Sequence, residues 1–88
     1  MGTDVLVEAG VGRSTVEGRA VAVVTTHSSI WLLDQEAHEF CRLPAGTRID
    51  DVMTVCVWRP YERLELDADT GAFALVDGTH IMRAWLAR

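Results

Sequence analysis

Lysine and asparagine are absent from the 88-residue sequence, so arginine is its only strongly basic residue. This bias is typical of very G+C-rich coding DNA and therefore indicates the origin of the gene rather than an activity. Positive charge is also scarce, because eight arginines against 13 acidic residues give a net charge of −5. Binding to nucleic acid irrespective of its sequence needs an excess of clustered cations, and the charge argues against it.

No apolar run is long enough to cross a membrane. The longest uncharged stretch, Ala20 to Leu33, is too short and is interrupted by polar residues. Near the N-terminus Asp4 and Glu8 stand where a secretory signal would need positive charge. We therefore predict a cytoplasmic protein that does not associate with membranes. Its two cysteines, Cys41 and Cys56, are then expected to be reduced rather than to form a disulfide framework.

Reactive side chains are not grouped in any pattern that predicts an enzyme. On a strand His27 and Ser28 point to opposite faces, and no acid is placed to orient the imidazole. His38 and Cys41 would also lie on opposite faces, and there is no Cys-x-x-Cys pair of the kind found in closed zinc sites. A glycine-rich phosphate loop is missing as well. We expect no catalytic residues, no metal and no cofactor.

What the sequence does contain is a series of short apolar blocks rich in Val, Ile, Trp and Phe, which favours strands. The clearest turn is Asp77-Gly78, since glycine supplies positive φ between two apolar runs. The spacing of the apolar residues in His80–Leu86 fits either a helix or a strand. The Asp77-Gly78 turn directly before this block favours a strand, because it returns the chain alongside Ala72–Val76. We predict one all-β domain, a small barrel or sandwich of about six to eight short antiparallel strands joined by hairpins. The expected strands are Asp4–Ala9, Arg19–Thr26, Ser29–Asp34, Glu39–Leu43, Thr54–Trp58, Tyr61–Asp67, Ala72–Val76 and His80–Leu86.

Two segments share the spacing Leu-Asp-x-acid-x-x-x-Phe, one starting at Leu33 and the other at Leu66. One explanation is a duplication that gives a pseudo-twofold barrel. The other is that hairpins with an acidic turn and an aromatic residue on the return strand have this form in common. Because the two halves share little else, the second explanation is favoured. Both predict two hairpins of similar construction.

Aromatic residues provide the candidates for a binding surface. Trp58-Arg59-Pro60-Tyr61 combines two rings, a cation and a rigid residue, and such residues dominate interface energetics. The alternative is that Trp58 fills the core while Tyr61 covers one end of a barrel. The strand Ser29–Asp34 is apolar on both faces, so its second face is either covered or forms a homodimer contact. The predicted partner-binding residues are Trp58, Arg59, Tyr61, Arg63, Ile30 and Leu32.

The segment from Val24 to Ala37 (VTTHSSIWLLDQEA), continuing to Arg42-Leu43-Pro44, resembles small uncharacterised β-rich proteins of actinobacteria and actinobacteriophages. In those proteins a Thr-x-x-Ser strand leads into an aromatic residue and a Leu-Asp turn, and the return strand contains an arginine. The resemblance covers about a third of the chain and implies no activity. It implies an origin that agrees with the lysine-free composition.

Elimination and this origin favour a non-enzymatic protein-interaction module, such as a phage-encoded accessory protein that binds a host protein. One alternative is a small β-barrel that stacks single-stranded nucleic acid on arginine and aromatic side chains. It predicts binding that is lost between low and physiological salt. The other alternative is a structural subunit, which predicts a stable homo-oligomer.

Overall fold

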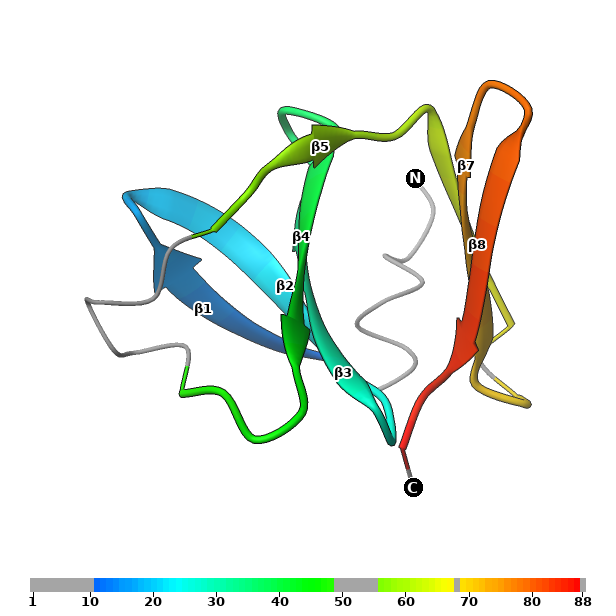
Figure 1. Cartoon of the computed structure of the whole chain (residues 1–88), viewed down its shortest axis with the longest axis horizontal. Helices are drawn as coiled ribbons and strands as arrows, with labels where there is room; N and C mark the ends of the chain where they lie inside the picture. Colours follow the sequence, from blue (N-terminus) through cyan, green and yellow to red (C-terminus); the bar gives the residue numbers. More distant parts are fainter. Residues whose placement is uncertain (1–10, 49–55, 68, 88) are drawn as a thin grey trace.

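The computed structural model describes residues 11–48, 56–67 and 69–87, which form antiparallel strands and no helix (Figure 1). The prediction of an all-β barrel or sandwich of about six to eight short strands is confirmed. None of these described residues lies in a helix long and apolar enough to cross a membrane. The strands are β1 (Gly12–Val16), β2 (Arg19–Thr25), β3 (Ser29–Asp34), β4 (Glu39–Pro44), β5 (Arg59–Pro60), β6 (Arg63–Leu66), β7 (Ala72–Asp77) and β8 (His80–Trp85).

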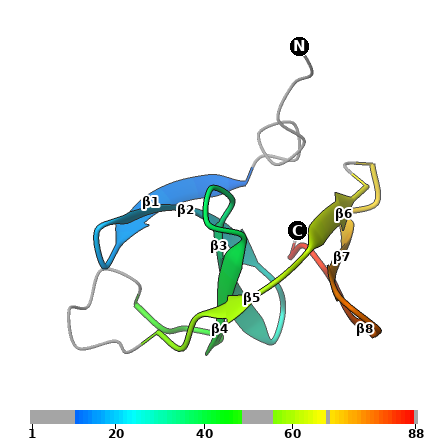
Figure 2. The same ribbon diagram turned by 90° about the horizontal axis from the view of Figure 1, so that it is seen from above.

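The strands form two sheets that pack on each other (Figures 1 and 2). Strands β1 to β5 pair in chain order in a five-stranded sheet, and β6, β7 and β8 pair in a three-stranded sheet. Because side chains alternate along a strand, each sheet turns one apolar face inward. The core between the sheets consists of Ala22, Val24, Trp31, Leu33, Phe40, Tyr61, Phe73 and Leu75.

The five-stranded sheet also buries side chains on its other face, as the two-sided pattern of Ser29–Asp34 predicts. On that face Leu32 is completely buried and Ile30 is half-buried. The segment that carries Cys56 and Trp58 packs against them. The chain itself therefore covers the second face and leaves the Leu32 side chain unavailable to a partner. This second cluster consists of Val16, Val21, Leu32, Cys41 and Leu43.

Two of the hairpin turns that use positive φ differ from expectation. Between β1 and β2, Glu17 and Gly18 form a two-residue loop with φ of 52° and 77°, which is the pattern of a type I′ turn. This hairpin was not predicted, because glutamate is unusual at a position with positive φ. The last hairpin turns one residue later than predicted, since Asp77 pairs with His80 and Gly78 begins the loop.

Six predicted strands are observed with ends that shift by at most two residues, including the ambiguous block that became β8. The prediction for Thr54–Trp58 is wrong at 56–58, which are not in a strand, and its first two residues lie outside the described residues. There the chain crosses the apolar face of the five-stranded sheet as an irregular segment. The predicted strand Asp4–Ala9 also lies outside the described residues.

Trp31 is at the centre of the core between the sheets. Its ring centroid lies 5.8 Å from that of Phe40 and 5.5 Å from that of Phe73, which it meets edge-on at 88°. The two phenylalanines occupy the same place in their hairpins, because Leu33 pairs with Phe40 and Leu66 pairs with Phe73. The shared spacing in the sequence therefore corresponds to two hairpins that each direct a phenylalanine against the same tryptophan.

Tyr61 belongs to this core, with 5% of its surface exposed, and its ring stacks on that of His38 at 5.3 Å. Burial, followed by the charge of Asp34, raises the pKa of Tyr61 above its usual value. The unfolded chain loses this proton first, so we expect the stability of the fold to fall as the pH rises through the folded pKa of Tyr61. An alkaline titration at 295 nm checks the shift, because the chain has no other tyrosine. A midpoint at the usual tyrosine value, near 10, would contradict the burial of this ring.

Candidate functional site

Two arginines occupy positions on the inner face of the five-stranded sheet, where alternation normally places apolar side chains. Phe40 points into the core, and Arg42 follows it two residues later on the same face of β4. Arg59 pairs directly with Phe40 across β4 and β5, so it also lies on the inner face. Both arginines are exposed. The sheet thus turns two cations toward a region that the opposite sheet leaves open.

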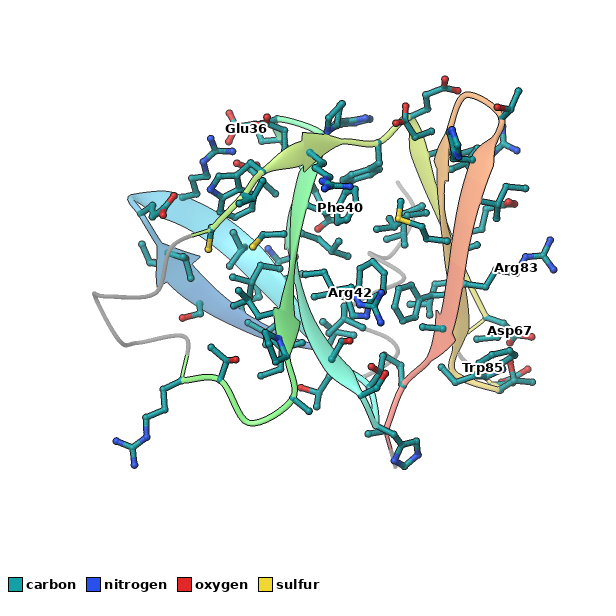
Figure 3. All side chains as sticks on the ribbon, in the orientation of Figure 1. Glu36, Phe40, Arg42, Asp67, Arg83 and Trp85 are labelled. Carbon is teal, nitrogen blue, oxygen red and sulfur yellow. The ribbon has the colours of Figure 1, made fainter. Side chains whose placement is uncertain are left out.

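This region is a cleft between β4 and β8, formed by two adjoining hollows that share Arg42 and Met82. The volume of the hollow nearer the β2–β3 turn is about 420 Å³, and that of the hollow nearer β5 is about 270 Å³. In Figure 3 the Arg42 side chain projects into the space between β4 and β8. The lining residues are Thr26, His27, Ser28, Trp31, Phe40, Arg42, Val57, Arg59, Met82, Arg83, Ala84 and Trp85.

Arg42 is held in place by a hydrogen bond of its Nε and by the ring below its guanidinium group. Its Nε donates to the hydroxyl of the buried Ser29 at 2.8 Å, and its guanidinium carbon lies 5.0 Å from the centre of the Trp31 ring. Thr26 and Ser29 bond to each other across the β2–β3 turn, which fixes the accepting hydroxyl. Neither terminal nitrogen of Arg42 has a partner among the described residues. An arginine that is already positioned loses little conformational freedom when it binds a ligand.

The cleft carries positive charge although the chain as a whole is acidic. No acidic residue lines either hollow within the described part of the chain. Elsewhere the carboxylates neutralise other arginines: Arg19 contacts Glu39 at 2.6 Å and Asp34 at 3.3 Å. The hydrogen bond with Glu39 is the largest of several effects that raise the pKa of Arg19. Arg42 and Arg59 differ from it because they lack an acidic partner among the described residues.

One of the residues that line the cleft has a buried donor for which the described part of the chain offers no partner. Trp31 lines the larger hollow and is 3% exposed, and its Nε1 is buried with no acceptor among the described residues. An unsatisfied buried donor costs about 1–3 kcal/mol.

A second groove lies on the outer face of the three-stranded sheet. Ala74 lies on its floor, Glu65 and Asp67 lie on one side, and Ile81 and Trp85 lie on the other. Trp85 is 59% exposed and Ile81 is 51% exposed, which is unusual for such large apolar side chains. Figure 3 shows Trp85 beside Asp67, and Arg83 pointing away from the cleft. Strand β8 therefore separates the basic cleft from an outer face on which Arg83 lies among apolar and acidic side chains.

Of the predicted partner-binding residues, only Arg59 lines the cleft. Tyr61 is in the core, which reverses the expectation that it covers one end while Trp58 fills the interior. Trp58 is half-buried on the other face, where its Nε1 donates to Glu17 at 2.8 Å and Arg19 lies 4.4 Å from its ring. Arg63 is exposed on β6, 3.8 Å from Glu65; Ile30 and Leu32 are in the second cluster.

Arg42 is the functional candidate that the sequence analysis missed. Its signal is the alternation Phe40-x-Arg42, in which a cation follows a core phenylalanine on the same face of a strand. His27 and Ser28 form the exposed end of the cleft, in the turn between β2 and β3. The described residues contain no group of three or more histidine, cysteine or acidic side chains that could hold a metal. No protein-family model, curated protein or solved structure matches the chain.

Proposed function

We propose that this protein is a non-enzymatic interaction module whose cleft between β4 and β8 binds an acidic, extended segment of another protein. The observation that carries the proposal is the pair Arg42 and Arg59, both exposed on the inner face of a sheet and facing no acidic residue in the described cleft. Carboxylates match guanidinium groups by charge and by paired hydrogen bonds.

Several features favour a protein over single-stranded nucleic acid as the partner. The net charge of −5 opposes a polyanion beyond the immediate cleft. Successive bases need several exposed aromatic faces, but Trp85 is the only exposed tryptophan or phenylalanine ring among the described residues that line the cleft, since Trp31 and Phe40 are buried and the Trp31 face is covered by Arg42. Arg42 and Trp31 of the cleft belong to the segment that resembles small proteins of actinobacteria and actinobacteriophages, and if the gene has a phage origin the partner would be a host protein.

We expect Arg42→Gln/Arg59→Gln to weaken the binding of an acidic peptide by about tenfold or more, because charge-assisted hydrogen bonds contribute about 1.5–3 kcal/mol each. The probe is a fluorescein-labelled heptapeptide, Thr-Glu-Val-Glu-Val-Glu-Thr, and the measurement is fluorescence anisotropy at physiological ionic strength. The matched control is Arg13→Gln/Arg63→Gln, which removes the same charge from exposed positions outside the cleft. We expect the control to change the affinity less than threefold, through long-range charge alone.

Three results would contradict the proposal. In the first, the peptide does not bind the wild-type protein. In the second, both double variants weaken binding equally, which indicates a general charge effect. In the third, a labelled oligothymidylate binds through Arg42 and Arg59 while the peptide does not, and the partner is then a nucleic acid. Far-UV circular dichroism of each variant confirms that the β-sheets are intact.

A further inference from the structure

Strand β8 has an open edge next to the cleft. In the described part of the chain it pairs with β7 alone. In an antiparallel pair, alternate residues direct both backbone groups toward the neighbour. His80 closes the two-residue hairpin, so it bonds to Asp77 of β7. At the other end of β8 the Leu86 N–H donates to the Gly71 carbonyl at 2.9 Å. The even-numbered residues of β8 therefore bond to β7. The outward-facing backbone groups belong to Ile81, Arg83 and Trp85.

Ala87 is the next residue whose backbone groups point away from β7, and it already bonds to another strand. The Ala87 N–H donates to the Thr25 carbonyl of the five-stranded sheet at 2.8 Å. The sheets are thus joined by one backbone hydrogen bond at this end of the cleft. From Ile81 to Trp85 no described strand pairs with this edge, and no described backbone group bonds to its three outward N–H and three outward C=O groups.

A strand added at this edge would lie in the cleft, because Met82, Arg83, Ala84 and Trp85 form one of its walls. Its side chains would alternate between two environments. Those on the inner side would face the five-stranded sheet, where Arg42 projects into the gap (Figure 3). Those on the outer side would continue the row of Ile81, Arg83 and Trp85, in which the two large apolar side chains are exposed.

We infer that the partner segment binds as an added β-strand on the open edge of β8, with acidic residues facing Arg42 and Arg59 and apolar residues beside Ile81 and Trp85. The inference rests on the proposed function and specifies its partner, a segment in which acidic and apolar residues alternate. Charge selects the occupant, because the inner wall is basic and contains no acidic residue in its described part. The charge of Arg83 in the middle of the edge disfavours pairing between two copies of β8 in register.

Backbone N-methylation of the peptide tests this arrangement. In an added strand, alternate N–H groups bond to β8 and the intervening ones point to solvent. One peptide therefore carries N-methyl groups on its central and flanking glutamates, and a second carries them on its two valines. We expect one methylated set to lose at least tenfold in affinity and the other to bind within threefold of the parent. Loss with the valine set indicates an antiparallel strand, and loss with the glutamate set indicates a parallel one.

The outcomes separate this inference from the proposed function. If the parent peptide binds through Arg42 and Arg59 but both methylated sets keep or lose affinity equally, strand addition is wrong and the function stands. If the parent does not bind, the function itself fails. Sedimentation velocity tests a second copy as the occupant. A dimer that Ile81→Pro disperses would overturn the inference, since that N–H faces the open edge and proline leaves the β7 ladder intact.

Discussion

We expect Leu75→Ala to lower the free energy of unfolding by about 2–5 kcal/mol, the cost of removing a fully buried leucine. Leu75 lies on the middle strand of the three-stranded sheet and is 0% exposed in the core shared with the other sheet. A domain of this size has about 5–10 kcal/mol of stability in total, so one substitution would remove a large part of it. Urea unfolding measured by circular dichroism gives the change directly.

Tryptophan fluorescence shows whether the two sheets unfold together. Of the three tryptophans, Trp31 is on the five-stranded sheet but contacts Phe73 of the three-stranded sheet, so its part of the signal reports the packing between them. Three strands need a packed face to be stable, and the described structure provides that face only against the other sheet. We expect fluorescence and circular dichroism to give coincident transitions in wild type and in Leu75→Ala. Separate transitions would contradict a shared cooperative core.

Ile81→Ala is the matched control for Leu75→Ala. It shortens a side chain of similar size in the same sheet, but on the outer face, where Ile81 is 51% exposed. We expect a loss below about 1 kcal/mol, because little buried surface is removed. An equal loss for both substitutions would show that the outer face is buried, and it would remove the open apolar surface on which the added strand depends.

Alternation along strands made much of the fold predictable. Ser29–Asp34 was predicted with its observed ends, and of the two explanations for its apolar second face, cover or a homodimer contact, the structure shows cover by the segment of Cys56 and Trp58. The β1–β2 hairpin was missed because Glu17 takes a positive φ that its residue type does not favour. The contact between Glu17 and Trp58 joins residues 41 positions apart, and such long-range pairing cannot be read from local pattern.

The cleft was harder to predict than the strands, because it depends on where one sheet stops covering the other. The sequence places Arg42 and Phe40 on one face. It does not distinguish an arginine that lines a cleft from one that lies at the exposed edge of that face. Similarly, Trp58 and Tyr61 are both aromatic, and only the path of the chain decides that Tyr61 enters the core. The predicted surface therefore contained Arg59 but missed its neighbour Arg42. Neighbours across strands, rather than along the chain, define this site.

The thiol of Cys56 gives the second large expected effect. The pKa of Cys56 is raised to about 12 from an ordinary value of 9.0. Burial has the largest effect, and it is followed by a hydrogen bond with the Cys41 thiol and then by charge effects. Alkylation requires the thiolate, and a shift of about three pH units lowers the thiolate fraction about a thousandfold. We therefore expect iodoacetamide to react with native Cys56 at least a hundredfold more slowly than with the urea-unfolded chain at pH 8. Mass spectrometry of labelled peptides measures both rates.

Cys41→Ala separates the causes of this protection. It removes the neighbouring thiol but keeps the segment of Cys56 packed on the second cluster, and burial is the largest contribution. We expect Cys56 to remain at least tenfold slower than in the unfolded variant, and native labelling at the unfolded rate would contradict its packing. The raised pKa of Cys56 also determines the direction in which stability changes with pH. Between about pH 9 and 12 the unfolded chain has lost the thiol proton and the folded chain has kept it. Stability should therefore decline across that interval in wild type, and it should decline less in Cys56→Ala.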